Sequence, residues 1–154
     1  MEKNYRPNVA AVILSSQYPK TCELLIAERS DIKGAWQFPQ GGIDGGEDTK
    51  TALFRELSEE IGTNEVEIIA EHPDWISYDF PGAVAERMYP YDGQRQKYFL
   101  VRLKNSAAIN LETKSPEFTR FKFVPVGEAL KKVSYFKRPI YKKVLEHFKK
   151  SGYL

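Results

Sequence analysis

The sequence predicts an α/β (α+β) fold in which a mixed β-sheet lies sandwiched between helices. Segments with the composition of strands occur before and after a segment whose apolar residues recur at helical spacing. The segments do not follow the regular alternation of a doubly wound parallel sheet, which favours a mixed sheet. The chain has 154 residues, a length that suits one domain with a core of its own. We therefore expect a single domain over residues 1–154.

The predicted strands are apolar or aromatic runs that polar or turn-forming residues bound on each side. In chain order they are Asn8–Ser15, Glu23–Glu28, Val66–Glu71, Trp75–Asp79, Lys97–Leu103 and Phe118–Val124. Between the second and third of them, the glycines and proline of Phe38–Glu47 predict a loop with special backbone requirements. We expect Trp36, Phe38 and Pro39 to act as scaffold that fixes the entry into this loop.

Helices are predicted at Asp48–Ile61, Val126–Val133 and Arg138–Lys150. In the first, Leu53, Leu57 and Ile61 recur at i, i+4 and i+8, and Gly62 stands where a C-terminal cap belongs. The last places its apolar residues at helical spacing and its lysines opposite them, which is typical of an amphipathic surface helix.

Composition excludes several classes of protein. The formal net charge is +2, too small an excess to predict nucleic-acid binding from charge alone. Cys22 is the only cysteine, so no intramolecular disulfide can form and a reducing compartment is expected. The apolar run Val9–Leu14 is shorter than a signal peptide needs, and no run approaches the roughly 18 apolar residues of a membrane span. We expect a soluble cytoplasmic protein that makes no membrane contact.

Three glutamates crowd the end of the first predicted helix. Glu56, Glu59 and Glu60 stand at i, i+3 and i+4, which puts them on one face. Like charges at these spacings cost a helix about 0.2–0.5 kcal/mol per pair, and the negative end of the helix dipole adds to that cost. The opposite apolar face should anchor the helix and point the glutamates outward. One interpretation is a solvated acidic face; the other is a site for cations.

A cation site is favoured by the glycine-rich loop before the helix, which lets backbone approach a ligand closely. Carboxylate oxygens suit hard cations, and Mg²⁺ typically combines one or two carboxylates with waters and substrate phosphate oxygens. Such ions would neutralise polyphosphate charge and activate a water molecule. We therefore expect Mg²⁺, with Mn²⁺ or another divalent cation as a substitute.

The run GGIDGGEDTKTALFRELSEEIGT resembles the Nudix box, GX5EX7REUXEEXGU, in which U is a bulky aliphatic residue. Read from Gly41, every fixed position matches, and only Thr63 departs, at the final packing position. The resemblance implies the Nudix fold and hydrolysis of a nucleoside diphosphate linked to another group.

Site roles follow from this resemblance. It implies that Glu56, Glu59, Glu60 and Gly41 bind the metal, that Glu47 supports the site or contributes to it, and that Arg55 orients the carboxylates by a salt bridge. Arg55 also stands four residues before Glu59, where opposite charges attract. Outside the box, it implies that Glu117 is a further metal ligand or the general base, and sequence alone does not choose between these.

The resemblance extends along nearly the whole chain. YRPNVAAVI, WQFPQGGID, QRQKYFL, SPEF and SYFKRPIY are similar to bacterial Nudix enzymes that remove pyrophosphate from triphosphorylated RNA 5′ ends and so prime mRNA decay. The chain is also similar to the asymmetrical diadenosine tetraphosphate hydrolases, which share WQFPQGG. The implied substrate is 5′-triphosphorylated RNA or, alternatively, a dinucleoside polyphosphate.

Substrate contacts are also implied by the resemblance. Arginine suits terminal phosphates, and an aromatic ring can stack on an RNA base. The expected contacts are Arg6, Arg29, Tyr78, Gln96, Lys97, Tyr135, Phe136 and Lys137. For Arg6 the alternative is a solvated terminal charge, and for Phe136 it is a core aromatic.

Other interpretations stay open at this point. A Nudix-fold protein without catalysis could bind nucleotides, although the intact glutamates argue against it. His72 and His147 are isolated from acidic or cysteine partners in sequence, so we expect both on the surface. We expect a monomer; the sequence does not indicate whether a partner protein stimulates it.

Overall fold

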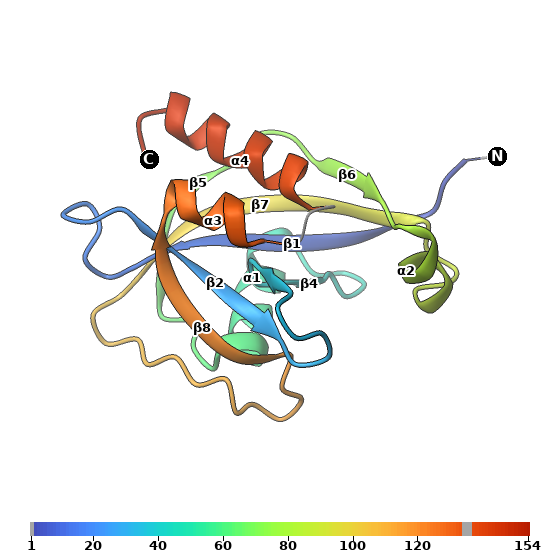
Figure 1. Cartoon of the computed structure of the whole chain (residues 1–154), viewed down its shortest axis with the longest axis horizontal. Helices are drawn as coiled ribbons and strands as arrows, with labels where there is room; N and C mark the ends of the chain where they lie inside the picture. The colour runs from blue at the N-terminus through green and yellow to red at the C-terminus, as the bar shows by residue number, and fades with distance from the viewer. Residues whose placement is uncertain (1, 134–136) are drawn as a thin grey trace.

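The computed structural model describes residues 2–133 and 137–154. Its centre is an eight-stranded mixed sheet whose main path runs β3-β2-β1-β7-β5, with β4, β6 and β8 paired to β1, β7 and β2. Helices α3 and α4 cover one face, and α1 covers the other (Figure 1). The predicted fold class, a mixed sheet between helices, is therefore confirmed.

In chain order the elements are β1 (Tyr5–Leu14), β2 (Glu23–Arg29), β3 (Trp36–Gln37), β4 (Gln40–Gly42), α1 (Thr49–Ile61), β5 (Val66–Glu71), β6 (Ile76–Asp79), α2 (Gly82–Arg87), β7 (Gly93–Leu103), β8 (Phe118–Pro125), α3 (Val126–Lys132) and α4 (Arg138–Lys150). The three predicted helices and six predicted strands are all present within a few residues of their expected bounds.

Two strands begin earlier than the sequence predicts. β1 starts at Tyr5 and β7 at Gly93, because the two run parallel and pair residue by residue from Tyr5–Gly93 to Leu14–Arg102. Pairing with a neighbour carries both strands into polar sequence that shows no apolar alternation. This extension places polar side chains of β1 and β7 at the edge of the core.

The prediction that Phe38–Glu47 is wholly loop was wrong, because β4 lies inside it. Gln40, Gly41 and Gly42 pair with β1 at Ala10, Val9 and Asn8. Helix α2 was not predicted either, and none of its residues is buried. Both elements are too short to show a period in the sequence.

β1 divides the core in two. Ala10, Val12 and Leu14 face α3 and α4, whereas the alternate residues Val9 and Ala11 face α1. A strand covered on both faces is apolar throughout, which explains the VAAVIL run. Phe38 is fully buried against Tyr141, with ring centroids 4.2 Å apart, in agreement with its expected scaffold role.

The prediction of two surface histidines was wrong for His72. Its side chain is only 3% exposed, and its ring lies 4.5 Å from that of His147 on α4. His72 Nδ1 accepts a hydrogen bond from the backbone N–H of Asp74, and burial, followed by the charge of His147, lowers the pKa of His72. The residue is buried because α4 packs over the end of β5, a contact between distant segments.

No helix in the described part of the chain is both long and apolar enough to cross a membrane. Cys22 carries a free thiol, is half-buried and packs against the core cluster on the face that α3 and α4 cover, as expected for a small residue beside a strand.

Candidate active site

Helix α1 holds the glutamate cluster in a fixed orientation. Asp48 caps its N-terminus by accepting a hydrogen bond from Thr51 N at 2.7 Å, and Gly62 ends it in the left-handed conformation with φ 74°. Leu53, Leu57 and Ile61 are buried against β1 and β7. Because the apolar face is anchored, the adjoining side of the helix, which carries Glu56 and Glu60 three residues after Leu53 and Leu57, meets β4.

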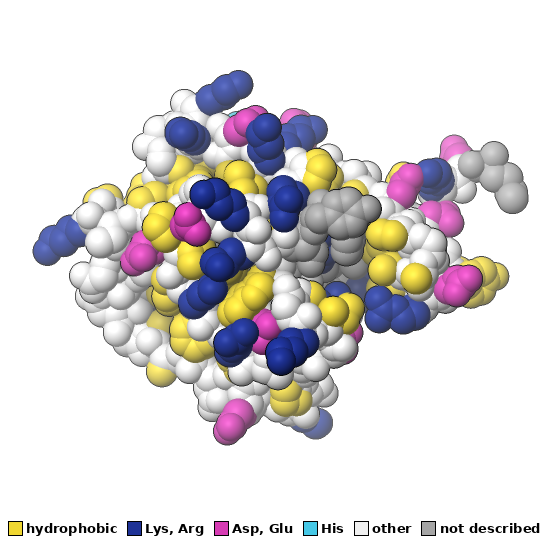
Figure 2. All heavy atoms as spheres, viewed as in Figure 1, with side chains coloured by type: hydrophobic (Ala, Val, Ile, Leu, Met, Phe, Trp, Pro, Cys, Tyr) yellow, Lys and Arg dark blue, Asp and Glu magenta, His cyan; other side chains and the backbone are white. Residues whose placement is uncertain are grey.

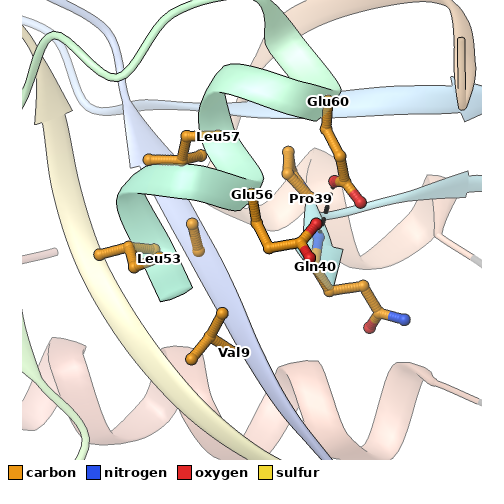
Figure 3. Close-up of a pocket in the computed structure, with 8 residues that line it drawn as sticks. Val9, Pro39, Gln40, Leu53, Glu56, Leu57 and Glu60 are labelled. Carbon is orange, nitrogen blue, oxygen red and sulfur yellow. Dashed lines mark hydrogen bonds between the residues drawn. The ribbon is translucent and has the colours of Figure 1, made fainter. Parts of the chain in front are cut away.

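The prediction that all three glutamates point outward was wrong. Glu60 is 6% exposed, and its Oε2 accepts a hydrogen bond from the backbone N–H of Gln40 at 3.0 Å. Glu56 is also largely covered, and only the side chain of Glu59 is mainly exposed. Figure 3 shows Glu56 and Glu60 projecting from α1 towards Gln40, on the side away from Leu53. β4 covers them, and the sequence pattern did not reveal this strand.

Burial changes the ionisation of these carboxylates. Loss of solvent raises the pKa of Glu60 well above its ordinary range, and the negative charge of Glu56 adds to the effect. Burial likewise raises the pKa of Glu56, against the opposing effect of Arg55. Two desolvated carboxyl groups beside each other gain strongly from a neighbouring cation, which supports the cation-site interpretation over a solvated face.

Arg55 ties the cluster together. Its guanidinium donates two hydrogen bonds to the Glu47 carboxylate, both at 2.8 Å, one to Glu56 at 2.8 Å and one to Glu59 at 3.1 Å. A further bond reaches the carbonyl oxygen of Gly42 on β4 at 2.8 Å. Arg55 lowers the pKa of Glu47 to about 2. One planar group therefore links the helix, the loop and β4.

The two glycines of β4 leave room for charged side chains. A Cβ atom on Gly41 would collide with the carboxyl group of Glu56, and one on Gly42 would collide with the guanidinium of Arg6. Neither glycine has a positive φ, so close approach explains them rather than backbone conformation. The requirement at these positions is empty space for Glu56 and Arg6.

A cavity of about 410 Å³ opens beside α1 and β4. Its lining includes the carboxylates of Glu56, Glu59, Glu60 and Glu117. It also includes four basic groups, which are Arg6, Arg29, Arg87 and Lys137. A cavity lined by both acidic and basic side chains suits a ligand that brings both cations and phosphates.

Most of the predicted site residues meet at this cavity. Arg29 forms a two-bond ion pair with Asp31 at its rim, at 2.7 and 2.6 Å. Tyr78 donates to Gln94 at 3.2 Å, and burial raises its pKa to about 12. Lys137 is 3% exposed and donates to Gln37 at 3.3 Å. Burial, then the charge of Arg29, lowers the pKa of Lys137 to about 7.

Two predicted contacts do not line the cavity. Gln96 is fully buried, and its side-chain amide donates to Asn8 at 2.9 Å and to Gln40 at 2.6 Å. Lys97 lies on the other face of β7, where it pairs with Glu71 at 3.3 Å. The alternation of side chains along a strand turns these neighbours in opposite directions, so a direct contact of Lys97 with substrate is not supported. Tyr135 and Phe136 lie outside the described residues.

Sequence reasoning missed several lining residues. Gln37, Gln40 and Gln94 line the cavity with their amides, and α2 contributes Val84 and Arg87. The glutamines carry no charge or spacing signal, although their polar side chains in otherwise apolar strands were visible in the sequence.

The carboxylates do not form a closed metal cage. Across residues 2–133 and 137–154, no three Asp, Glu, His or Cys side chains converge as a preformed metal-binding cluster. The donor set still fits a hard cation such as Mg²⁺, which needs only one or two carboxylates beside waters and phosphate oxygens. The raised pKa values of Glu56 and Glu60 agree with this fit.

The fold and the cavity together define a class of α/β protein in which a carboxylate-bearing helix and basic side chains line one cavity, a lining that suits a polyphosphate with its cations. The chain belongs to the NUDIX domain family, whose sequence profile matches residues 4–144.

Curated relatives match over nearly the full length. The chain is 64% identical to a protein of a Nitratiruptor species named RNA pyrophosphohydrolase, over 99% of this chain and 98% of that protein. Proteins with the same name from Campylobacter jejuni subsp. doylei and Helicobacter pylori are 62% and 56% identical, over 99% and 100% of this chain and 98% and 99% of theirs.

Solved structures share the fold at low identity. The E. coli dihydroneopterin triphosphate pyrophosphohydrolase superposes with a TM-score of 0.71 at 20% identity, over 92% of this chain and 97% of that one. A C. elegans Ap4A hydrolase binary complex gives 0.67 at 22%, over 94% and 98%. At these identities the similarity concerns the fold alone.

Proposed function

We propose that this protein is an RNA pyrophosphohydrolase that converts 5′-triphosphate RNA into 5′-monophosphate RNA and thereby initiates mRNA decay. The observation that carries the proposal is the 64% identity, over 99% of the chain, with a relative of that name. The cavity supports it, because both carboxylates and basic groups line it. Hydrolysis of a dinucleoside polyphosphate is the alternative that the shared WQFPQGG stretch keeps open.

Glu56, Glu59, Glu60 and Glu117 would hold one or more divalent cations, and Gly41 gives Glu56 the space it needs. When bound, such an ion supplies neutralisation of phosphate charge and an acidified water. Arg55 keeps Glu56 and Glu59 oriented through its direct hydrogen bonds. Glu47 in turn fixes Arg55 in place. Water adds to a phosphorus of the triphosphate and gives up a proton to a base, the anhydride bond between the α- and β-phosphates breaks, and pyrophosphate leaves while the RNA keeps a 5′-monophosphate.

The basic side chains that line the cavity would bind phosphates of the substrate. Arg6 and Arg29 can each donate paired hydrogen bonds to phosphate oxygens, and Tyr78 lies at the same cavity. The pKa of Lys137 is lowered. A phosphate oxygen or a base acceptor beside its amine would favour the protonated ammonium form, which can donate a hydrogen bond to that acceptor. Tyr135 and Phe136 stay predicted contacts of the RNA base. Glu117 lines the same cavity, which supports its predicted role as a general base or a further metal ligand.

The test compares two substrates in the presence of Mg²⁺. A short single-stranded 5′-triphosphate RNA and diadenosine tetraphosphate are supplied separately at equal low concentration, and kcat/KM is measured for each. We expect RNA to be preferred at least about tenfold, a difference near 1.4 kcal/mol in transition-state stabilisation. The Glu59→Gln variant is the matched control, and its turnover should fall on both substrates.

A preference for diadenosine tetraphosphate would remove the RNA assignment and leave the hydrolase assignment in place. Unchanged turnover by Glu59→Gln would instead remove Glu59 from the metal site. The cytoplasmic location belongs to this proposal, because bacterial transcripts are made and degraded there. Two statements stay predictions: residues 1–154 form one domain, and the protein acts as a monomer. No prediction is made about a stimulating partner protein.

Replacing Arg55 by lysine is expected to lower kcat about 10–100-fold, the range seen when a group that orients metal ligands is lost. Lysine keeps the positive charge but cannot bond Glu47, Glu56 and Glu59 together in one plane. The Mg²⁺ concentration for half-maximal rate should rise as well. Steady-state RNA hydrolysis at several Mg²⁺ concentrations measures both, and an unchanged rate would show that the guanidinium does not orient the carboxylates.

A further inference from the structure

Outside the cavity, cations gather on the sheet around Trp36. The guanidinium of Arg120 lies 5.1 Å from the centre of the Trp36 ring, and the ammonium of Lys122 lies 4.6 Å from it. Both cations come from β8, two residues apart on one face of the strand. They cover the indole, which is 8% exposed. Figure 2 shows Lys and Arg side chains gathered on this face, over α3 and β8.

Negative charge on this surface is sparse. Arg120 pairs with Glu28 on β2, with its Nε 2.8 Å from Oε1. Among the described residues, neither Lys122 nor Lys132 at the end of α3 has an ion-pair partner within 4.0 Å. Desolvation, then the positive charges of Lys132 and Arg120, lowers the pKa of Lys122. Three cations around one carboxylate therefore repel one another, and a polyanion would relieve that repulsion.

The basic surface of Arg120, Lys122 and Lys132 adjoins the cavity. Trp36 stands in β3 between the lining residues Ala35 and Gln37, and Glu28 stands in β2 before the lining residue Arg29. Because side chains alternate along a strand, the basic surface faces the opposite side of the sheet from these lining residues and meets the cavity around the β3 edge. On β8, Lys122 lies five residues beyond Glu117, roughly 16 Å along an extended chain. A strand of nucleic acid whose end occupies the cavity would reach this surface after a few nucleotides.

We infer that Arg120, Lys122 and Lys132 form a binding surface for the phosphate backbone of the RNA downstream of its 5′ end. The inference rests on the proposed function and adds to it a contact that short substrates cannot make. Backbone contacts by Lys and Arg carry no base information, so the surface would strengthen binding of any sequence. It would distinguish RNA chains from mononucleotides and dinucleotides.

The experiment combines a double variant with two lengths of substrate. Lys122→Gln/Lys132→Gln is compared with the native protein on 5′-triphosphate RNAs of two and of about ten nucleotides, as kcat/KM with Mg²⁺. On the longer RNA we expect a loss of roughly tenfold, mostly in KM, and a salt dependence shallower by about 1.4 in slope, because each single-strand phosphate contact contributes about 0.7. On the RNA of two nucleotides the loss in kcat/KM should stay within about twofold, which also shows that the variant is folded.

The matched control is Lys149→Gln/Lys150→Gln, which removes two exposed lysines from the last turn of α4. This change removes the same charge, also near a helix C-terminus, and should leave the length dependence intact. An equal loss in both double variants, or an equal loss on both RNAs, would overturn the inference and leave the proposed function standing. Failure of the native protein to hydrolyse either RNA would overturn both.

Discussion

Glu60→Gln is expected to stabilise the metal-free protein while abolishing most of its activity. Glu60 is buried, and its raised pKa arises first from desolvation and then from the charge of Glu56; the attraction of Lys137 is a smaller effect. Glutamine removes the buried charge and can still accept the hydrogen bond from Gln40 N. At pH 8 in EDTA, the melting temperature should rise by about 3 °C or more, since about 1 kcal/mol shifts it by about 2–4 °C at this chain length.

The same substitution should lower kcat at least about 100-fold, the upper end of what the loss of a mere supporting group costs a metal site. Added Mg²⁺ should raise the melting temperature of the native protein, because it binds the folded state, and should raise that of Glu60→Gln much less. Thermal unfolding with EDTA and with Mg²⁺, alongside RNA hydrolysis, measures all three quantities. A variant that is destabilised in EDTA would contradict the conclusion that burial of the Glu60 charge is unfavourable.

Gly41→Ala is expected to cost activity with little loss of stability. The new methyl group would occupy the place of the Glu56 carboxyl group, which is the far end of a flexible side chain and can turn away. Turning away breaks the 2.8 Å bond to Arg55 and removes Glu56 from the cavity wall. We expect kcat to fall about 100-fold and the melting temperature to fall by only about 2–4 °C, as measured by hydrolysis and thermal unfolding.

Gly45→Ala, in the loop that follows β4, is the matched control. A Cβ atom at Gly45 would meet no atom within 4 Å, and its φ is not in the left-handed region. Its kcat should stay within about twofold of the native value, because an alanine without strain changes mainly the unfolded chain. If Gly41→Ala kept the same activity as Gly45→Ala, the position of the Glu56 carboxyl group beside β4 would have no role in the reaction.

These expectations share one physical basis. The site concentrates negative charge where burial makes it unfavourable, and Arg55 offsets that charge only for Glu47, Glu56 and Glu59 among the box glutamates. Glu60 has a backbone N–H as its hydrogen-bond donor. The buried negative charge therefore lowers the free energy of unfolding of the metal-free protein. Binding of a cation with its phosphate ligand would raise it again.

The α1 helix shows how much local sequence can determine. Leu53, Leu57 and Ile61 define its buried face, and Asp48 and Gly62 define its ends, so the helix was predicted almost to the residue. Spacing alone also placed Glu56 and Glu60 on one face, because side-chain direction in a helix repeats every 3.6 residues. The metal chemistry expected of the box depends only on such local facts.

The surroundings of that helix were decided by contacts between distant segments. β4 buries Glu60 through one backbone hydrogen bond, and three residues are too few to show a strand period in the sequence. The parallel pairing of β1 with β7 sets where both strands begin and turns Gln96 and Lys97 to opposite faces. No local pattern records which segments will be neighbours.

By itself, the sequence determined the fold class, the carboxylate helix and the family, because these are written in short-range periodicity and in a contiguous motif. The tertiary structure decided which carboxylates are buried, which cations face them, and that Arg120 and Lys122 meet over Trp36. Arg6, Arg29 and Lys137 are far apart along the chain and come together at one cavity only when the sheet forms. Burial and long-range electrostatics depend on that folded geometry.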